Sequence, residues 1–135
     1  ENAGYTIPEE AVEFEKESGL FSMAVGVGTA HGFYKEKPQL NKDLIVTLRG
    51  MLTAPMVLHG ASGLSDDDVR GCIARGICKV NFATELRAAY TEGVKEVLGD
   101  TPNVFDPKAY GREARRRVTE LVKSRMLVCG CDGKA

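Results

Sequence analysis

The chain holds two histidines, His31 and His59, and both occur in a local pattern that could bind a metal ion. Each follows an apolar run and directly precedes a glycine, in GTAHG and VLHGASG. Imidazole nitrogens are common zinc ligands, with Zn–N bonds of about 2.0–2.1 Å. Two imidazoles at neighbouring strand ends could reach one cation, because adjacent strands lie about 4.8 Å apart. The pattern therefore predicts a metal site, with two hydrogen-bonded structural histidines as the alternative.

Two further segments have the composition of phosphate-binding loops. Residues 60–63 (GASG) combine small residues with one hydroxyl, so their backbone N–H groups could approach an oxyanion closely. Residues 81–84 (NFAT) open a predicted helix, whose N-terminus attracts phosphate. Taken singly, GASG could be an ordinary turn and Asn81 a helix cap. Together with the histidines, the segments predict a metal ion between two phosphate-binding loops.

The elements that must position these residues alternate along the chain. Apolar spacing and cap residues predict a helix from a Thr6 cap to Ser18, ended by Gly19, and a helix from a Ser65 cap to Gly76. The remaining predicted helices cover 41–52, 86–97 and a last segment around 114–122, and the predicted strands cover 20–27, 56–58 and 77–82. Strands that alternate with helices indicate an α/β fold with a parallel sheet, whose strand ends share one rim.

Composition argues against several other classes of protein. The 135 residues include 18 basic and 19 acidic side chains, which disfavours nucleic acid as a partner, and no apolar run is long enough to cross a membrane. A nucleic-acid binder remains a rival interpretation, on a last helix that carries Arg112, Arg115, Arg116 and Arg117, although a solvated face explains these arginines equally well. The spacing of the four cysteines does not match a zinc finger. Cys72 and Cys78 are expected to be buried free thiols, and Cys129 and Cys131 a reduced pair typical of the cytoplasm.

Longer stretches around these motifs resemble a known enzyme family. GVGTAHGFYKEKPQLNKDL, PMVLHGASGLSDDDVRGCIARGICKVNFATELRAAY and the terminal DGKA are similar to the class II, zinc-dependent ketose-bisphosphate aldolases. These enzymes cleave fructose-1,6-bisphosphate or tagatose-1,6-bisphosphate. The resemblance implies a (β/α)8 TIM barrel, of which residues 1–135 form the C-terminal half with the last three strands and their helices. It also implies a cytoplasmic lyase of carbohydrate metabolism.

The resemblance assigns roles to individual residues. It implies that His31 and His59 are two of three zinc ligands and that Lys35 lies near the substrate phosphate. The carbonyl groups of Gly32 and Gly60 resemble a Na⁺ or K⁺ site. The positions that match contacts to dihydroxyacetone phosphate are Gly32, Gly60, Ala61, Ser62, Asn81, Phe82, Ala83 and Thr84.

The same resemblance implies that important groups lie outside this sequence. They are the third zinc histidine, the aspartate that acts as acid and base, and a mobile acidic loop expected before Glu1. We therefore expect no catalytic residue here, weak zinc binding and no activity of the chain alone. Open sheet edges predict association with the missing half or with another copy. Ala61 favours the tagatose-type branch and the GKA ending the fructose type, while a non-catalytic sugar-phosphate-binding or barrel-completing module is the alternative function.

Overall fold

The computed structural model describes residues 4–36 and 38–134. Ala135, the last residue of the GKA ending, lies outside them. The chain divides into two compact units, Glu1–Phe82 and Ala83–Ala135, which are described separately. No helix of the described residues is both long and apolar enough to cross a bilayer.

The first unit is built on a parallel sheet of three strands in the order β1-β2-β3. These strands are β1 (Met23–Ala24), β2 (Met56–Leu58) and β3 (Ile77–Val80). Met23 pairs with Met56, and Leu58 pairs with Val80. All three residues of β2 are buried, which is typical of a central parallel strand covered on both faces. The predicted parallel sheet and its strand order along the chain are confirmed.

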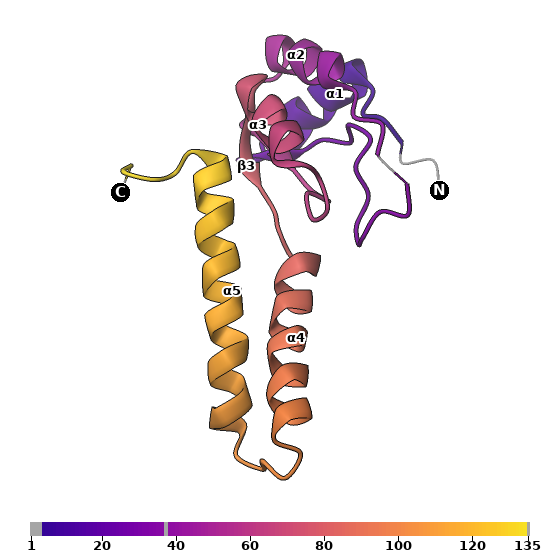
Figure 1. The fold of residues 1–135 in the computed structure, drawn as a ribbon. Helices are drawn as coiled ribbons and strands as arrows, with labels where there is room; N and C mark the ends of the chain where they lie inside the picture. The colour runs from indigo at the N-terminus through magenta and orange to yellow at the C-terminus, as the bar shows by residue number, and fades with distance from the viewer. Residues whose placement is uncertain (1–3, 37, 135) are drawn as a thin grey trace. The chain divides into compact units, whose positions relative to one another are not determined.

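The same unit has three helices, α1 (Pro8–Ser18), α2 (Lys42–Met51) and α3 (Asp66–Ala74) (Figure 1). Helix α1 contacts α2, α2 contacts α3, and α3 contacts β3. Buried apolar side chains from the helices and the strands form a small core. Each fully buried aliphatic side chain contributes about 1.5–3 kcal/mol relative to an exposed one. The largest fully buried side chains are Ile45, Leu48, Leu58, Val27, Val69 and Cys72.

Of the predicted helix ends, those at Ser65 and Gly19 are confirmed, and the helix predicted to reach Gly76 ends at Ala74. The Ser65 side chain accepts a hydrogen bond from the Asp68 N–H, and Gly19 ends α1 in the left-handed conformation. The predicted Thr6 cap is wrong, because Ile7 occupies the N-cap position and no side chain caps it. Thr6 instead pairs with Gly26: its N–H donates to the Gly26 carbonyl at 2.8 Å, and its hydroxyl accepts from the Gly26 N–H at 2.7 Å. Thr6 thus anchors the chain before α1 to the segment that follows β1.

The outer strands are shorter than predicted. The regular part of β1 covers only Met23–Ala24 of the predicted 20–27, and Phe21 is 92% exposed. The expectation that Cys78 is buried is also wrong, since only Ile77 of β3 is fully buried and Cys78 is exposed. Successive side chains of a strand point to opposite faces of the sheet, so Cys78 faces away from the side on which Ile77 is buried. Cys72, in contrast, is buried as expected, and burial raises the pKa of its thiol.

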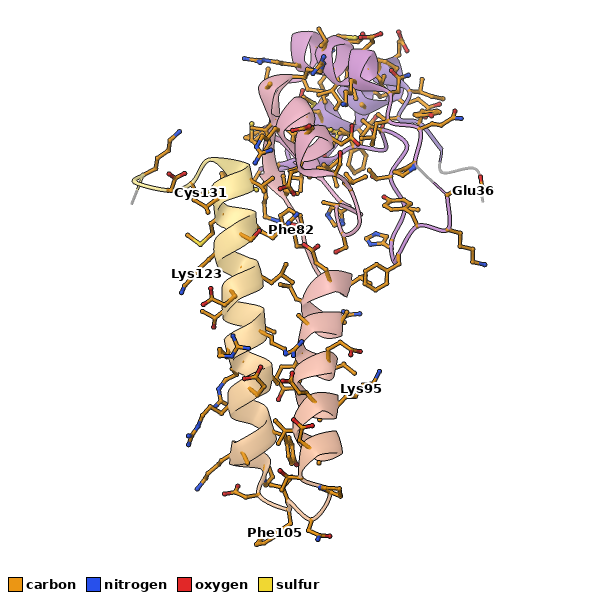
Figure 2. All side chains as sticks on the ribbon, viewed as in Figure 1. Glu36, Phe82, Lys95, Phe105, Lys123 and Cys131 are labelled. Atoms are coloured by element: carbon orange, nitrogen blue, oxygen red, sulfur yellow. The ribbon has the colours of Figure 1, made fainter. Side chains whose placement is uncertain are left out.

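The second unit is a hairpin of two antiparallel helices, α4 (Thr84–Asp100) and α5 (Pro107–Cys129) (Figure 1). They approach closely at Gly93, where an added Cβ would lie 2.7 Å from the Ala114 Cα. Lys95 and Lys123 point away from the opposite helix, and Phe105 lies in the connecting loop (Figure 2). The last helix extends well beyond the predicted 114–122, because Pro107 starts it and Gly130 ends it in the left-handed conformation.

Two of the four arginines named for the nucleic-acid interpretation, Arg116 and Arg117, form ion pairs within this hairpin. Arg116 and Arg117 both bind the carboxylate of Glu113, and Arg117 also binds Glu96 of α4. The Arg116 side chain, through its hydrogen bonds and charge, holds the pKa of Glu113 below its ordinary value. For Arg116 and Arg117, these contacts favour the solvated helix face over the nucleic-acid interpretation.

Candidate metal and phosphate site

The rings of His31 and His59 lie next to each other in the first unit. Their centroids are 5.6 Å apart and their planes are inclined by 84°. His59 directly follows β2, whereas His31 lies in the longer loop between β1 and α2. The side chain of His31 is exposed and that of His59 is half-buried. Two histidines from successive loops therefore meet at the carboxyl end of the parallel sheet.

This ring spacing fits a shared metal ion. Two imidazoles bound to one tetrahedral zinc ion have centroids about 5 Å apart, because each Zn–N bond is about 2.0–2.1 Å. Among the described residues, His31 has no hydrogen-bond partner, and the only partner of the His59 ring is Asn81. Both ring nitrogens of His31 and the Nδ1 of His59 are therefore without a partner among these residues. No group of three His, Cys, Asp or Glu side chains that could hold a metal occurs within residues 4–36 and 38–134.

Asn81 orients the ring of His59 from the end of β3. Its Nδ2 lies 2.9 Å from the His59 Nε2, and its Oδ1 accepts a hydrogen bond from the Lys79 ammonium group. Because Oδ1 faces a donor, the amide nitrogen faces His59, which makes Nε2 an acceptor and puts the ring proton on Nδ1. A predicted phosphate-binding residue is thus a hydrogen-bond partner of a predicted metal ligand.

The loops that carry the two histidines are joined by the hydroxyl of Tyr34. This hydroxyl donates to the Gly60 carbonyl at 2.6 Å and accepts from the Ala30 N–H at 3.0 Å. Burial raises the pKa of Tyr34 above the ordinary 10.0, so the hydroxyl remains protonated at neutral pH. The loops also touch through their backbones, since a Cβ on Gly60 would lie 2.4 Å from the Ala30 carbonyl oxygen. Ala30 precedes His31 and Gly60 follows His59, so the Tyr34 hydroxyl binds backbone groups directly next to both histidines.

The loop after His59 has the compact backbone expected of a phosphate-binding turn. Gly60 and Gly63 both have positive φ, at +66° and +90°. Between them, Ala61 and Ser62 are buried, with 1% and 4% exposure, and the Leu64 N–H donates to the Ala61 carbonyl at 3.1 Å. Gly32 also has positive φ, at +105°, beside His31. The predicted positions 32 and 60–62 are therefore next to the two histidines in the structure as well as in the sequence.

A cavity of about 350 Å³ lies beside this loop. Lys35 lines it together with Tyr34, Gly63 and Ser65. Asp68, another lining residue, binds the Lys42 ammonium at 2.8 Å and accepts from the Ser65 hydroxyl at 2.7 Å. Lys35 and the adjacent acidic residue Glu36 both line this cavity, and the predicted role of Lys35 near a phosphate stays a prediction.

The predicted segment 81–84 is divided between the two units. Asn81 and the half-buried Phe82 end the first unit, while Ala83 is the N-cap of α4 and Thr84 its first residue. The structure brings His31, His59 and Asn81 together. It describes Ala83 and Thr84 only as part of the hairpin.

Two residues of the site were not predicted from the sequence. The Tyr34 hydroxyl donates to the Gly60 carbonyl on another loop, and the Lys79 ammonium donates to the side chain of Asn81. The one signal for Tyr34 was its place within the stretch GTAHGFYK beside His31. No spacing rule marks a hydroxyl that binds backbone groups of two loops.

Solved structures with the same architecture include two aldolases. The YdjI aldolase of Escherichia coli K12 is 41% identical and superposes with a TM-score of 0.86, over 97% of this chain and 48% of that chain. The fructose-bisphosphate aldolase of Campylobacter jejuni is 20% identical with a TM-score of 0.78, over 97% and 49%, and shows the fold alone. The chain spans about half the length of these structures. Its parallel sheet is consistent with half of an aldolase barrel.

The comparison with protein families extends over almost the whole chain. The model described as "Fructose-bisphosphate aldolase class-II" matches residues 1–134, which include both histidines, the GASG loop and the NFAT segment. A match of this extent, together with the 41% identical structure, settles the relationship. The chain belongs to the class II fructose-bisphosphate aldolase family.

Proposed function

We propose that this chain supplies part of the zinc- and phosphate-binding machinery of a class II ketose-bisphosphate aldolase. The complete enzyme would cleave fructose-1,6-bisphosphate or tagatose-1,6-bisphosphate reversibly into dihydroxyacetone phosphate and glyceraldehyde 3-phosphate in the cytoplasm. The observation that carries the proposal is the 5.6 Å separation of the His31 and His59 rings, within a chain of this family.

His31 and His59 would hold the zinc ion, with neutral imidazoles that leave its full charge available. When bound, zinc supplies Lewis-acid chemistry that polarises a substrate carbonyl. Asn81 would keep the His59 ring in one orientation through its contact with Nε2, which leaves Nδ1 as the nitrogen that faces away from Asn81. Because both histidines flank the loop 60–63, a phosphate bound there would fix the substrate relative to the rings, which converts binding energy into orientation.

The remaining groups would come from outside residues 1–135. Zinc sites that catalyse reactions usually have three protein ligands, and among the described residues no third His, Cys, Asp or Glu joins the two histidines. We propose that a third histidine and the aspartate that transfers protons lie on the other half of the barrel. The chain alone would then bind zinc weakly and would not catalyse cleavage. Gly32 and Gly60 carbonyls would take a Na⁺ or K⁺ ion in the complete site.

Reconstitution with the other half tests this function. The chain is mixed or co-expressed with a polypeptide that contains the preceding half of the parent protein, and cleavage of both bisphosphates is measured with and without EDTA. We expect activity only in the mixture, its loss with EDTA and its recovery with zinc. His59→Ala should abolish activity, whereas Lys123→Ala, on the outer side of α5, should not. Cleavage by the chain alone, or by the mixture with His59→Ala, would contradict the proposal.

The alternative is a sugar-phosphate-binding module without catalysis. It is favoured by the compact loop 60–63 and the cavity that Lys35 lines, neither of which needs a metal. Titration with dihydroxyacetone phosphate distinguishes the two functions. Affinity that is unchanged by EDTA, with no cleavage in the reconstituted mixture, would favour the module.

A further inference from the structure

We infer that Tyr34 is a positioning residue whose hydroxyl fixes the His31 loop against the His59 loop and thereby sets the separation of the two imidazoles. The inference deepens the proposed function and rests on it as far as the bound metal is concerned. It makes Tyr34 part of the support of the site and not a ligand.

The geometry places one hydroxyl between the residues adjacent to both histidines. Tyr34 donates to the carbonyl of Gly60, the residue after His59, at 2.6 Å. It accepts from the N–H of Ala30, the residue before His31, at 3.0 Å. A change in either bond therefore moves the backbone beside one ring relative to the other.

The His31 loop has little other regular support. Neither His31 nor its immediate neighbours belong to a helix or strand. The paired backbone groups nearest to it are the Val27 carbonyl and the Asn41 N–H, which lie well before and well after the histidine. The hydroxyl of Tyr34 is consequently the hydrogen-bonded link closest to His31 among the described residues.

The aromatic ring and the hydroxyl of Tyr34 have separable roles. The ring packs against the phosphate-loop residue Gly63, where an added Cβ would lie 3.3 Å from the Tyr34 Cδ2. Tyr34→Phe keeps this packing and removes only the hydroxyl. A matched control exists in Tyr5, whose hydroxyl also donates to a backbone carbonyl, that of Gln39, at 3.0 Å. Gln39 belongs to the same loop as His31 but is not adjacent in sequence to either histidine.

The first measurement needs no metal. Amide hydrogen exchange at Ala30 and the ring ¹⁵N signals of both histidines are recorded by NMR for the unmodified chain, Tyr34→Phe and Tyr5→Phe. We expect the Ala30 amide to be protected in the unmodified chain and in Tyr5→Phe, and to exchange at least about tenfold faster in Tyr34→Phe. Both histidine signals should shift in Tyr34→Phe only. An unprotected Ala30 amide in the unmodified chain would overturn the inference even if the variant failed to fold.

The second measurement uses zinc alone as the probe. The ring signals of His31 and His59 are followed during a zinc titration, and urea unfolding is measured in parallel. Loss of an outer group that orients metal ligands typically costs about 10–100-fold in affinity. We expect at least a tenfold weaker zinc affinity in Tyr34→Phe, with an unfolding midpoint equal to that of Tyr5→Phe.

The outcomes separate the two proposals. If zinc shifts neither ring in the unmodified chain, zinc binding by this chain as proposed above is wrong, and the metal-free measurement still decides the role of Tyr34. If zinc binds equally to the unmodified chain and to Tyr34→Phe, or if Tyr34→Phe leaves Ala30 exchange unchanged, the positioning role is wrong.

Discussion

The His31 imidazole lies edge to face against the His59 imidazole, at a centroid separation of 5.6 Å and an interplanar angle of 84°. The two residues come from different loops, so this contact depends on the pairing of β1 with β2 and on the backbone contact between Ala30 and Gly60. Any change that shifts one loop relative to the other should therefore alter the pair. The predictions below address this support and the packing of each unit.

Removal of the Asn81 amide should change the tautomer of His59. The Asn81 Nδ2 donates to the His59 Nε2 at 2.9 Å, and such a hydrogen bond contributes about 1 kcal/mol, or about a fivefold change in a tautomer ratio. Asn81→Ala should raise the Nε2–H fraction of His59 by about that factor, as measured from ring ¹⁵N shifts. The ratio for His31 serves as the internal control. An unchanged His59 ratio would mean that the amide does not set the tautomer.

Gly60→Ala should destabilise the first unit more than Gly19→Ala. Both glycines have a positive φ, +66° and +59°, which costs an alanine about 1–2 kcal/mol. At Gly19 a Cβ meets nothing within 4 Å, whereas at Gly60 it would lie 2.4 Å from the Ala30 carbonyl oxygen. We expect a loss above this range at Gly60 only, measured by urea unfolding. Equal losses would contradict the close contact of the two loops.

Glu15→Gln should make the free energy of unfolding less dependent on pH in the acidic range. The Glu15 carboxylate accepts hydrogen bonds from the Ala54 and Thr53 backbone, which hold its pKa below the ordinary 4.5. The pKa of Glu15 is lower in the folded chain than in the unfolded chain. Its carboxylate therefore stabilises the fold fully at pH values above the unfolded pKa, and this stabilisation is lost as the pH falls through the folded pKa.

Unfolding midpoints in urea between pH 7 and pH 3 provide the measurement. Glu15→Gln should lower the midpoint at pH 7 and approach the unmodified chain at low pH. Glu13→Gln, an exposed position on the same helix, is the control and should change neither. Parallel curves for Glu15→Gln and the unmodified chain would contradict the role of these hydrogen bonds.

Two glycines of α4 should respond in opposite directions to alanine. At Gly93 a Cβ would lie 2.7 Å from the Ala114 Cα, so Gly93→Ala should push α4 and α5 apart and cost about 1–3 kcal/mol. At Gly99 a Cβ meets nothing within 4 Å, and helix propensity should stabilise Gly99→Ala by up to about 1 kcal/mol. Thermal unfolding followed by circular dichroism measures both. Stabilisation by Gly93→Ala would show that the helices are less closely packed.

The sequence allowed the paired histidines to be predicted because parallel strands end on one rim. His59 follows a buried apolar run directly, and the rings of His31 and His59 meet as that prediction requires. The Ser65 cap and the Gly19 stop were also predictable, since each depends on local backbone chemistry alone. The metal and phosphate roles of these residues stay predictions.

Other features depend on contacts that no local pattern encodes. The sequence pattern predicts Thr6 as a helix cap. In the structure, the Thr6 hydroxyl and N–H form hydrogen bonds with the backbone of Gly26, which is distant in sequence. Cys78 belongs to an apolar run, yet it lies on an outer strand and is exposed. The bonds of the Tyr34 hydroxyl to two loops could not be predicted from spacing either, because both partners are backbone groups.

The boundary between Phe82 and Ala83 has a consequence for how such chains could be recombined. Four groups of the site lie before this boundary: the two imidazoles, the Asn81 amide and the Tyr34 hydroxyl. A chimaera joined at this boundary would therefore receive all four from one parent. The helical hairpin after the boundary carries none of these four groups. A junction between Phe82 and Ala83 would divide the NFAT segment. A chimaera that keeps this segment whole should therefore be joined after Thr84.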